Sequence, residues 1–377
     1  MARLSRAETQ ERNRAKVLAA ARAEFIERGF REAKIDEIAE RADLTRGAVY
    51  SNFPGKRALY FAVLADAAER APAPPPADPG RGPREALGAL ARAWVADLPL
   101  ATDERGSPSR LGADLIPEVL ADERTRRPFA QLLRLDAILL GVALEQLRPA
   151  RSPGARLVRV AEAALTTLHG ASRLAAAAPG FGEPFNVVRV CEELAGLDLA
   201  DGWTGPPIIP EARAADEPWA PPPAVDALRG EPAPIASDGV VTVLGLHRLS
   251  AAEDALRAAP PGAEVTAVLV SPDAGELGPL ARLAVAEFRG LLRHAIPPSA
   301  WPRLRIVHDE SGEVAAAAGV TDLGDMTETA VRVEQGRVVR RAEGFGAGDA
   351  VAGARTRAKL TRAGRGRGAD RASGRAG

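Results

Sequence analysis

Residues 14–70 restrict the fold of this chain more than any other stretch, because short amphipathic segments follow one another there with only tight turns between them. In the first segment apolar residues recur at helical spacing, which predicts a helix that buries one stripe. Gly29 is expected to end that helix as a left-handed C-terminal cap. A second short helix is expected to follow, with Ile35 and Ile38 facing the core. The layout is that of a helix-turn-helix and points to DNA rather than to catalysis.

The segment after the second helix has the features of a recognition helix. Ala42-Asp43-Leu44 is the predicted turn, and Thr45 is a good N-cap for a third helix that ends before Phe53. The outward residues of this helix carry groups that can reach base edges in the major groove, and Lys56 is expected to lie beside a phosphate. The predicted DNA contacts are Thr45, Arg46, Gly47, Tyr50, Ser51, Asn52 and Lys56. The alternative is a small helical bundle with no role in binding nucleic acid.

The run IAERADLTRGAVYSNFPGKRALY, residues 38–60, resembles the DNA-binding region of the TetR family of bacterial transcriptional repressors. Three positions depart from the pattern of that family: Asp43 where a turn glycine is usual, Lys34 where a capping threonine is common, and Asn52 where histidine is frequent. Aspartate tolerates a left-handed backbone, so Asp43 is compatible with the turn. The resemblance implies a helix-turn-helix domain over residues 1–70 that binds a palindromic operator in double-stranded DNA.

Two proline-rich breaks divide the rest of the chain. The first covers residues 71–83, and the second, residues 201–238, is predicted to be an extended, semi-rigid linker. Between them, residues 84–200 have the pattern of an all-α domain, with helices predicted over residues 84–97, 112–121, 128–147, 155–178 and 184–197. This order resembles the ligand-binding and dimerisation region of TetR-family regulators. The resemblance implies a homodimer, joined through the last two helices, whose recognition helices lie about one DNA turn, ~34 Å, apart.

A few polar or aromatic residues of the all-α domain are candidate contacts for a small-molecule effector. Asp136 interrupts a segment that is apolar nearly all round, so its carboxylate could bind a cationic or hydroxylated ligand. In the family it resembles, the late helix often borders the pocket, and here that helix carries His169 and Arg173 one turn apart. Thr166 and Trp94 complete the predicted lining. The alternative is that Asp136 faces water or pairs structurally, and that Trp94 belongs to the core.

From Gly239 the period of the apolar residues changes, and residues 239–352 have the predicted order β-α-β-α-β-α-β-β-α, with a hairpin that turns at Gln335-Gly336. This order resembles the thioredoxin-like fold. The redox-active Cys-x-x-Cys of that fold is replaced by the run Ser271-Pro272-Asp273-Ala274-Gly275. Thiol–disulfide exchange needs a thiolate, so a redox-inactive module used for binding or dimer support is predicted. An α/β domain of another topology is the alternative.

Cys191 is the only cysteine, which excludes a disulfide within one chain and suits a reducing cytoplasm. A buried thiol in the dimer interface is one interpretation of it, and an intersubunit disulfide or redox sensor is the other. The four histidines lack metal-ligand spacing, and no P-loop, Rossmann glycine pattern or nucleophile elbow occurs. No signal peptide and no apolar run of about eighteen residues is present. The prediction is a cytoplasmic protein with no catalytic site, metal, cofactor or membrane span.

Together these patterns predict a multi-domain fold class. An all-α helix-turn-helix domain and a helical ligand-binding and dimerisation domain, both TetR-like, precede an α/β thioredoxin-like domain and a basic disordered tail over residues 353–377. The expected function is that of a dimeric, sequence-specific transcriptional regulator, a repressor that a small-molecule effector releases from its operator. The alternative is a thiol-redox enzyme or redox-linked adaptor acting through the C-terminal domain.

Overall fold

The computed structural model of the chain describes residues 5–71, 80–98, 111–148, 156–178 and 180–353. These residues form two compact units. The first unit joins the chain up to Trp203 to Ala227–Arg229 and Ser271–Pro302. The second unit contains Thr204–Asp226, Gly230–Val270 and the chain from Arg303 onward. This division differs from the predicted domain boundaries, because two segments beyond Trp203 belong to the helical unit.

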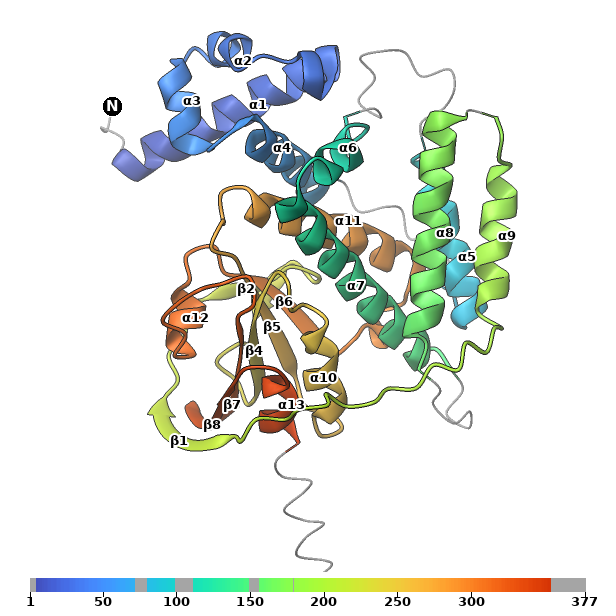
Figure 1. Cartoon of the computed structure of the whole chain (residues 1–377), viewed down its shortest axis with the longest axis vertical. Coiled ribbons are helices and arrows are strands. Elements are labelled where there is room, and N and C mark those ends of the chain that lie inside the picture. The colour runs from blue at the N-terminus through green and yellow to red at the C-terminus, as the bar shows by residue number, and fades with distance from the viewer. Residues whose placement is uncertain (1–4, 72–79, 99–110, 149–155, 179, 354–377) are drawn as a thin grey trace, which may run out of the picture. The chain divides into compact units, whose positions relative to one another are not determined.

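Four helices build the N-terminal part of the first unit (Figure 1): α1 (Arg6–Glu32), α2 (Ile35–Arg41), α3 (Arg46–Asn52) and α4 (Lys56–Arg70). The chain leaves the helical conformation at Gly29, whose φ of 76° is positive, but its ψ of 170° is not that of the predicted left-handed cap, and α1 resumes after it to end at Glu32, with Ala33 as the C-cap. The amide of Phe30, next to this break, donates a hydrogen bond to the side chain of Asp114 at 2.9 Å. The helices predicted for this part of the chain are therefore present.

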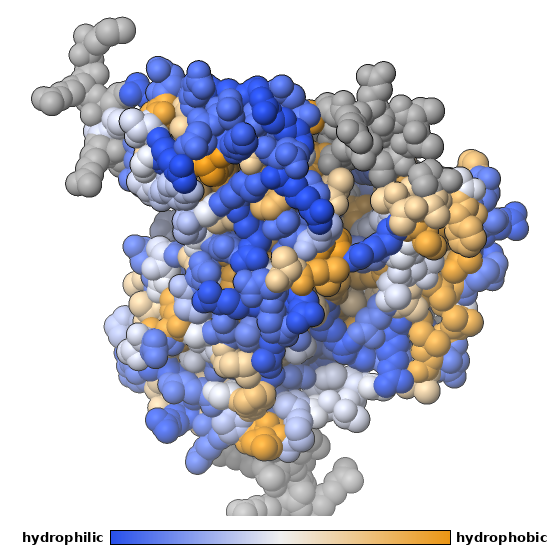
Figure 2. All heavy atoms as spheres, turned by 45° about the horizontal axis from the view of Figure 1, so that its top comes forward, coloured by the Kyte–Doolittle hydropathy of each residue, from blue (hydrophilic) through white to orange (hydrophobic). Residues whose placement is uncertain are grey.

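Five further helices match those predicted for the middle of the chain: α5 (Pro83–Ala96), α6 (Leu115–Leu120), α7 (Glu123–Gln146), α8 (Val158–Ala177) and α9 (Pro184–Leu194). α7 begins before the predicted start at Pro128, because the Asp122 side chain caps it by accepting a hydrogen bond from the Arg124 amide at 2.9 Å. α5 packs against α8 and α9, and α7 packs against α8. Figure 2 shows apolar residues gathered over α8 and α9, where Phe181 and Phe185 are 74% and 75% exposed.

α11 (Leu277–Ala295) packs with the helical unit, although it follows a strand of the second unit along the chain. It contacts α4, α5 and α7, and Figure 1 shows it crossing behind α7. Most of its apolar residues are buried, among them Leu280, Phe288 and Leu292. A helix with a broad apolar side needs partners to bury that side, and the helical unit provides them. α11 therefore does not pack in the α/β domain to which the sequence pattern assigns it.

The second unit is built around a mixed six-stranded sheet with the strand order β1-β8-β7-β4-β5-β6. Its strands are β1 (Arg213–Pro218), β4 (Gly239–Gly245), β5 (Val265–Val270), β6 (Leu304–His308), β7 (Glu328–Glu334) and β8 (Arg337–Glu343). β4 is parallel to β5 and antiparallel to β7, and β5 is parallel to β6. Every residue of β4 and β5 is buried, which accounts for the near-continuous apolar runs of these two strands.

α10 (Ala251–Ala258), α12 (Glu313–Ala317) and α13 (Ala347–Ala352) complete this unit in the order that the sequence predicts. β7 and β8 form the predicted hairpin, and its turn residues Gln335 and Gly336 have positive φ angles of 52° and 70°. Two successive residues with positive φ give a turn whose twist matches that of the flanking strands. The sheet and its helices are compatible with the predicted α/β class.

The segment predicted to be a proline-rich linker, residues 201–238, contains regular structure. It supplies β1 and a two-stranded hairpin of β2 (Ala224–Asp226) and β3 (Glu231–Ala233). Trp219 of this segment is 5% exposed in the apolar core of the sheet and donates a hydrogen bond to the carbonyl of Ile235 at 2.9 Å. Proline is tolerated in such edge and short strands, because few of their amides are needed for pairing. The prediction of an extended linker is therefore wrong for these strands.

A thioredoxin-like topology is not confirmed for the second unit. The predicted order of elements along the chain is present, but one order of elements is compatible with several strand orders. Here the first strand of the region, β4, lies inside the sheet between β5 and β7.

The predicted basic tail lies outside the described residues from residue 354 onward. Among the helices that the structure describes, none is both long enough and apolar enough to cross a lipid bilayer.

Candidate DNA-binding interface and ligand pocket

α2, the turn that follows it and α3 form a helix-turn-helix. Asp43 occupies the turn with a φ of 54°, the left-handed backbone that the sequence predicted an aspartate would tolerate there. Thr45 caps α3 by accepting a hydrogen bond from the Ala48 amide at 3.2 Å. Val49 and Phe53 are buried on the inner side of this helix. The opposite side of α3 therefore faces solvent.

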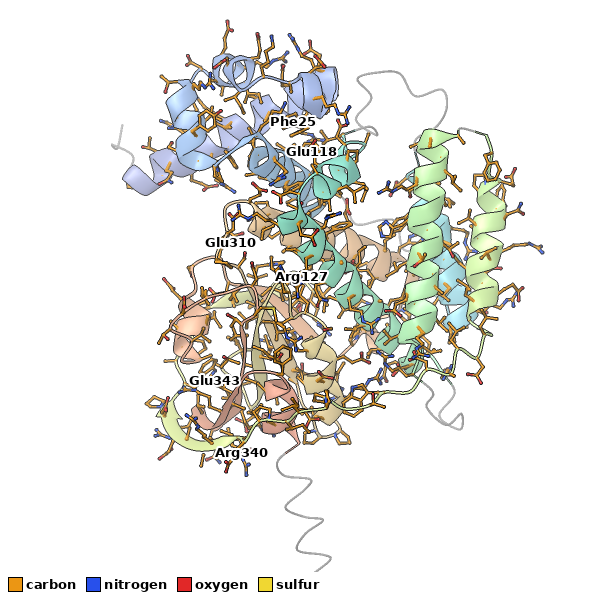
Figure 3. All side chains as sticks on the ribbon, viewed as in Figure 1. Phe25, Glu118, Arg127, Glu310, Arg340 and Glu343 are labelled. Carbon is orange, nitrogen blue, oxygen red and sulfur yellow. The ribbon has the colours of Figure 1, made fainter. Side chains whose placement is uncertain are left out.

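Aromatic packing holds these helices together. Phe25 of α1, labelled in Figure 3, packs edge-to-face on Tyr60 of α4, with 5.2 Å between the ring centroids. Tyr60 is fully buried and donates a hydrogen bond to the carbonyl of Leu111 at 2.7 Å. A buried tyrosine with a bonded hydroxyl fixes the orientation of the helix that carries it. α4 is thus held firmly where it follows the recognition helix.

The solvent-facing side of α3 presents Arg46, Gly47, Tyr50 and Ser51, and the Tyr50 residue is 42% exposed. The Arg46 guanidinium lies 5.5 Å from the centroid of the Tyr50 ring and pairs with Asp36 of α2 at 3.2 Å. Guanidinium and phenol groups are suited to hydrogen bonds with base edges and phosphates. The structure thus brings these four predicted contacts to one exposed surface, while Asn52 is half-buried.

Like Thr45 and Arg46, three further predicted DNA contacts form bonds within the domain. The Ser51 hydroxyl and the Asn52 side-chain amide both donate to the carbonyl of Ala48, at 2.9 and 2.8 Å. The Lys56 ammonium donates to two backbone carbonyls at the end of α1, including that of Ala33 at 3.0 Å. Lys56 therefore ties the end of α1 to the start of α4. A contact between Lys56 and a phosphate stays a prediction.

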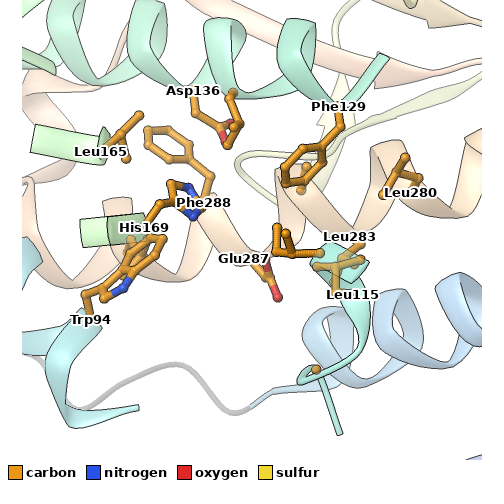
Figure 4. A pocket seen from close by; sticks show the side chains of 15 residues that line it. Trp94, Leu115, Phe129, Asp136, Leu165, His169, Leu280, Leu283, Glu287 and Phe288 are labelled. Atoms are coloured by element: carbon orange, nitrogen blue, oxygen red, sulfur yellow. The ribbon is translucent and has the colours of Figure 1, made fainter. Parts of the chain in front are cut away.

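A pocket of about 170 Å³ opens among α5, α6, α7, α8 and α11 of the helical unit (Figure 4). Its walls are mostly apolar, and the ionisable residues among those lining it are two acids and a histidine. The lining residues are Trp94, Gly112, Leu115, Ile116, Phe129, Leu133, Asp136, Leu165, His169, Leu280, Leu283, Ala284, Glu287, Phe288 and Leu291. A largely apolar pocket with a few convergent polar groups is typical of a small-molecule site.

Trp94, Asp136 and His169, three of the predicted ligand contacts, line this pocket. The Trp94 and His169 rings meet edge-to-face with 4.8 Å between centroids, and the Trp94 indole donates to the Ser172 hydroxyl at 2.8 Å. Asp136 is 7% exposed, and its Oδ1 atom has no hydrogen-bond partner among the described residues. Burial, and secondarily the charge of Glu287, holds the pKa of Asp136 well above its usual range.

Thr166 and Arg173, the other two predicted ligand contacts, do not line the pocket. Both are exposed and lie on the outer side of α8, at helical spacing from Gly170 and Leu174. Arg173 acts on the pocket electrostatically: burial is the main cause of the lowered pKa of His169, and the charge of Arg173 lowers it further. Leu165, one turn before His169, lines the pocket with it, whereas Thr166 and Arg173 lie on another side of α8.

α11 supplies lining residues that the sequence did not reveal, among them Glu287 and Phe288. Glu287 is an exposed residue, and it keeps this accessible surface where it lines the pocket. The surrounding protein partly desolvates its carboxyl, which raises the pKa to about 7, and Asp97 is the second cause. One signal was present in the sequence: Glu287 is the only acidic residue of α11. That signal does not show which helices surround it.

The described residues offer no centre for metal or thiol chemistry. Among them, no group of three or more His, Cys, Asp or Glu side chains is arranged to hold a metal ion. Cys191 on α9 is a free, buried thiol, and burial, followed by the charge of Glu192, raises its pKa to about 11. Since the thiolate is the reactive form, this thiol is largely inert at neutral pH. The structure thus favours a buried structural cysteine over a redox sensor.

Comparison with known proteins gives matches that centre on the DNA-binding helices. The model of the bacterial regulatory proteins of the tetR family matches residues 17–63. The HTH-type transcriptional regulator SrpR of Pseudomonas putida is 45% identical over 65 residues, which are 17% of this chain and 30% of SrpR. The HTH-type transcriptional activator FasR of Mycolicibacterium smegmatis is 40% identical over 55 residues, which are 15% of this chain and 25% of FasR.

Among solved structures, a TetR transcriptional regulator from Rhodococcus sp. RHA1 aligns with a TM-score of 0.32 and 20% identity, over 50% of this chain and 95% of that chain. The chain spans less than a third of the length of SrpR and FasR. The sequence similarity therefore concerns the N-terminal domain, where it includes all of α2, the turn and α3.

Proposed function

We propose that this chain is a sequence-specific transcriptional regulator, on the premise that its N-terminal domain is a TetR-family DNA-binding domain. The exposed face of α3 carries this proposal. Val49 and Phe53 fix the helix to the domain, while Arg46 and Tyr50 stand on its outer side. A helix presented in this way fits the major groove, where the base edges identify the sequence. Double-stranded DNA is thus the proposed partner.

The proposal includes a homodimer joined through α8 and α9. Leu174, Phe181, Phe185 and Val190 of this region are all exposed, at 46% to 75% of their surfaces. Large apolar side chains that gather on one surface mark an interaction site. A two-fold dimer would present two recognition helices to the two halves of a palindromic operator. Replacement of Phe181 and Phe185 by Asp is expected to give monomers in sedimentation-velocity experiments, and an unchanged dimer would contradict this interface.

The proposal also includes release from the operator by a small molecule bound in the pocket, as in a repressor. Arg57 of α4 supports such coupling, because its guanidinium pairs with Asp122 at 3.0 Å and donates to Glu276 at 2.6 Å. Asp122 is the N-cap of α7 and Glu276 is the N-cap of α11, and both helices line the pocket. The ligand must bind the released state more tightly, since equal affinity for both states shifts nothing.

The test is fluorescence-anisotropy binding of the full chain to its own promoter DNA, beside a scrambled duplex, at two salt concentrations. The promoter duplex is expected to bind more tightly, and to keep this preference at the higher salt, because base contacts depend on salt less than phosphate contacts do. Tyr50→Ala should weaken promoter binding about tenfold or more.

Phe345→Ala is the control, because Phe345 is an exposed aromatic residue of the second unit, at 56%. Its promoter binding should match that of the wild type. Equal binding of promoter and scramble by the wild type would overturn the proposed sequence specificity.

A further inference from the structure

The residues that line the pocket include acidic side chains but no lysine or arginine. Asp136 on α7 and Glu287 on α11 both line it, and no lysine or arginine is among its lining residues. Figure 4 shows Asp136 reaching in from α7, with the rings of Phe129 and Phe288 on either side of it in this view. An anionic ligand would meet two acidic side chains and no lysine or arginine among the lining residues. The pocket is therefore complementary to a positively charged group.

Of the two acids, Asp136 is the one that is buried and, within the part of the chain that the structure describes, lacks a hydrogen-bond partner for one of its oxygens. It is 7% exposed, and its Oδ1 atom lacks a hydrogen-bond partner among the described residues. A buried polar atom without a partner is destabilising, so such atoms usually have an external partner such as a ligand, an ion or ordered water. The raised pKa of this carboxyl favours its protonated form, and a nearby cation would favour the ionised form instead.

The size and the walls of the pocket limit the cation. Its volume of about 170 Å³ resembles that of engineered apolar cavities, near 150 Å³, that bind benzene. Trp94, Phe129 and Phe288 offer ring faces or edges to a ligand, and rings attract organic cations as well as apolar groups. No described cluster of acidic, histidine or cysteine side chains fits a metal ion. The chemistry thus favours an organic ammonium ion over a metal.

We propose that the pocket binds a small organic cation with a single ring, whose ammonium group lies between the carboxylates of Asp136 and Glu287. The ring then occupies the apolar part of the pocket near Phe129 and Phe288. α11 is part of this ligand site, although it lies far from α7 in the chain. The role of this cation as an effector rests on the proposed function of the chain as a regulator, whereas its binding to the pocket does not.

Three probes of similar size and different charge test the proposal on the full wild-type chain by calorimetry at pH 8. They are 2-phenylethylammonium, 2-phenylethanol and phenylacetate. The cation is expected to bind with a Kd of about 1 mM or tighter, which is reasonable for so few atoms. The alcohol should bind at least tenfold more weakly and the anion not measurably. Equal or tighter binding of the alcohol, or no binding of the cation, overturns the proposal.

Variants locate the charge. Asp136→Asn and Glu287→Gln should each weaken binding of the cation tenfold or more and leave binding of the alcohol within about threefold. Glu123→Gln is the matched control, because Glu123 is an exposed acid on the same helix as Asp136, outside the pocket. Its affinity for the cation should equal that of the wild type. Unchanged binding of the cation in both pocket variants would place the charge recognition elsewhere and overturn the proposal.

The two proposals fail separately, because ligand binding is measured without DNA. If the cation binds but leaves operator affinity unchanged, the ligand class stands and the effector role falls. If operator DNA binds specifically but the cation does not bind, the ligand class falls and DNA recognition stands.

Discussion

The DNA-binding region and the ligand pocket are both built from helices, but the helices of the pocket come from more distant parts of the sequence. α1 to α4 follow one another directly, and the cap and ion pair of the recognition helix, Thr45 to Ala48 and Arg46 to Asp36, join residues close in the chain. The pocket combines helices from the middle of the chain with α11, which stands between two strands of the sheet. Local contacts of the first kind can be predicted from a sequence, whereas the second kind depends on long-range packing.

The largest effect on stability is expected from removing α11, the helix that joins the helical unit from a distant part of the chain. A chain that ends after Trp203 lacks α11, so the surfaces of α4, α5 and α7 that it covers become exposed. Full burial of one leucine or phenylalanine is worth roughly 1.5–3 kcal/mol. The loss of several such residues therefore approaches the whole stability of a typical domain, about 5–15 kcal/mol. Calorimetry should show no cooperative unfolding transition for the helical unit of this chain.

A chain that ends at Gly353 is the control for this truncation, because it keeps every element that the structure describes. Its unfolding transition should match that of the full chain. If the chain ending after Trp203 melts cooperatively near the wild-type temperature, α11 is an accessory to the helical unit and the comparison between the two regions fails.

The DNA-binding helices were predicted well from the sequence because their turns and caps depend on residues that are close together in the chain. Asp43 and Thr45 each determine backbone geometry or a cap within a few residues of themselves, and the structure shows both acting as expected, while Gly29 interrupts α1 instead of ending it. The pocket was predicted in part. Asp136 is conspicuous within an apolar helix, but the partners of a buried acid are not encoded next to it.

The parts that were wrong or incomplete depend on distant packing. Glu287 could not be placed beside Asp136 without knowing that α11 leaves the sheet. Trp219 lies in a proline-rich segment, and the edge strand of that segment exists only because β8 is available to pair with it. Strand order likewise depends on which edges meet in three dimensions. Periodicity gives the elements but not their neighbours.

The link between the two regions can be broken at Arg57. If pocket and operator site are coupled through its contacts with Asp122 and Glu276, Arg57→Ala should remove most of the effect of a pocket ligand on operator affinity. Coupling of this kind is typically about 5–150-fold. Calorimetry with 2-phenylethylammonium and anisotropy with operator DNA should show each separate affinity within a few-fold of wild type.

Arg84→Ala is the control for this experiment, because Arg84 pairs with Glu193 on α9, away from α4. Its coupling should be that of the wild type. Full coupling in Arg57→Ala would mean that the signal passes through the packing of α11 on α4 instead.

Substitution of two glycines compares how closely α7 and α11 are packed within the helical unit. A Cβ atom at Gly141 of α7 would lie 2.7 Å from the Cα atom of Val158, so Gly141→Ala must push α7 and α8 apart, at a cost of about 1–3 kcal/mol. A Cβ atom at Gly290 of α11 meets nothing within 4 Å, so Gly290→Ala should stabilise the helix by up to about 1 kcal/mol. Thermal unfolding measures both. A rise in Tm for Gly141→Ala would show that the α7–α8 contact adapts easily.

The acids of the pocket predict a dependence of stability on pH that the DNA-binding helices should lack. Burial holds the pKa of Asp136 above its usual range, so the folded protein keeps a proton that the unfolded chain releases, and the exposed Glu287, whose pKa is also raised, contributes less because solvent screens it. Stability is therefore lost as the pH rises from about 4 through the folded pKa values. Asp136→Asn removes one such group. Its Tm, relative to wild type, should rise by a few degrees between pH 5 and pH 8.

Other charged groups near the pocket require this comparison between variant and wild type at each pH. Burial, and secondarily Arg173, lowers the pKa of His169, which changes stability in the opposite direction, and Asp97 acts on Glu287. These contributions are shared by both proteins and cancel in the difference. The same Tm difference at pH 5 and pH 8 would mean that Asp136 is ionised in the folded protein throughout.

The smallest expected effect is local and lies in the DNA-binding helices, at Asp43. Its φ of 54° is a conformation that glycine adopts without strain and that aspartate tolerates at a small cost. Asp43→Gly relieves that strain but also gives the unfolded chain more freedom, so the net gain should be only about 0.5 kcal/mol. Asp43→Ala should lose about 1 kcal/mol, because alanine lacks the short polar side chain that eases this conformation. Thermal unfolding of both variants measures the difference, and a lower Tm for glycine than for alanine would show that the Asp43 side chain, rather than its backbone, determines the turn.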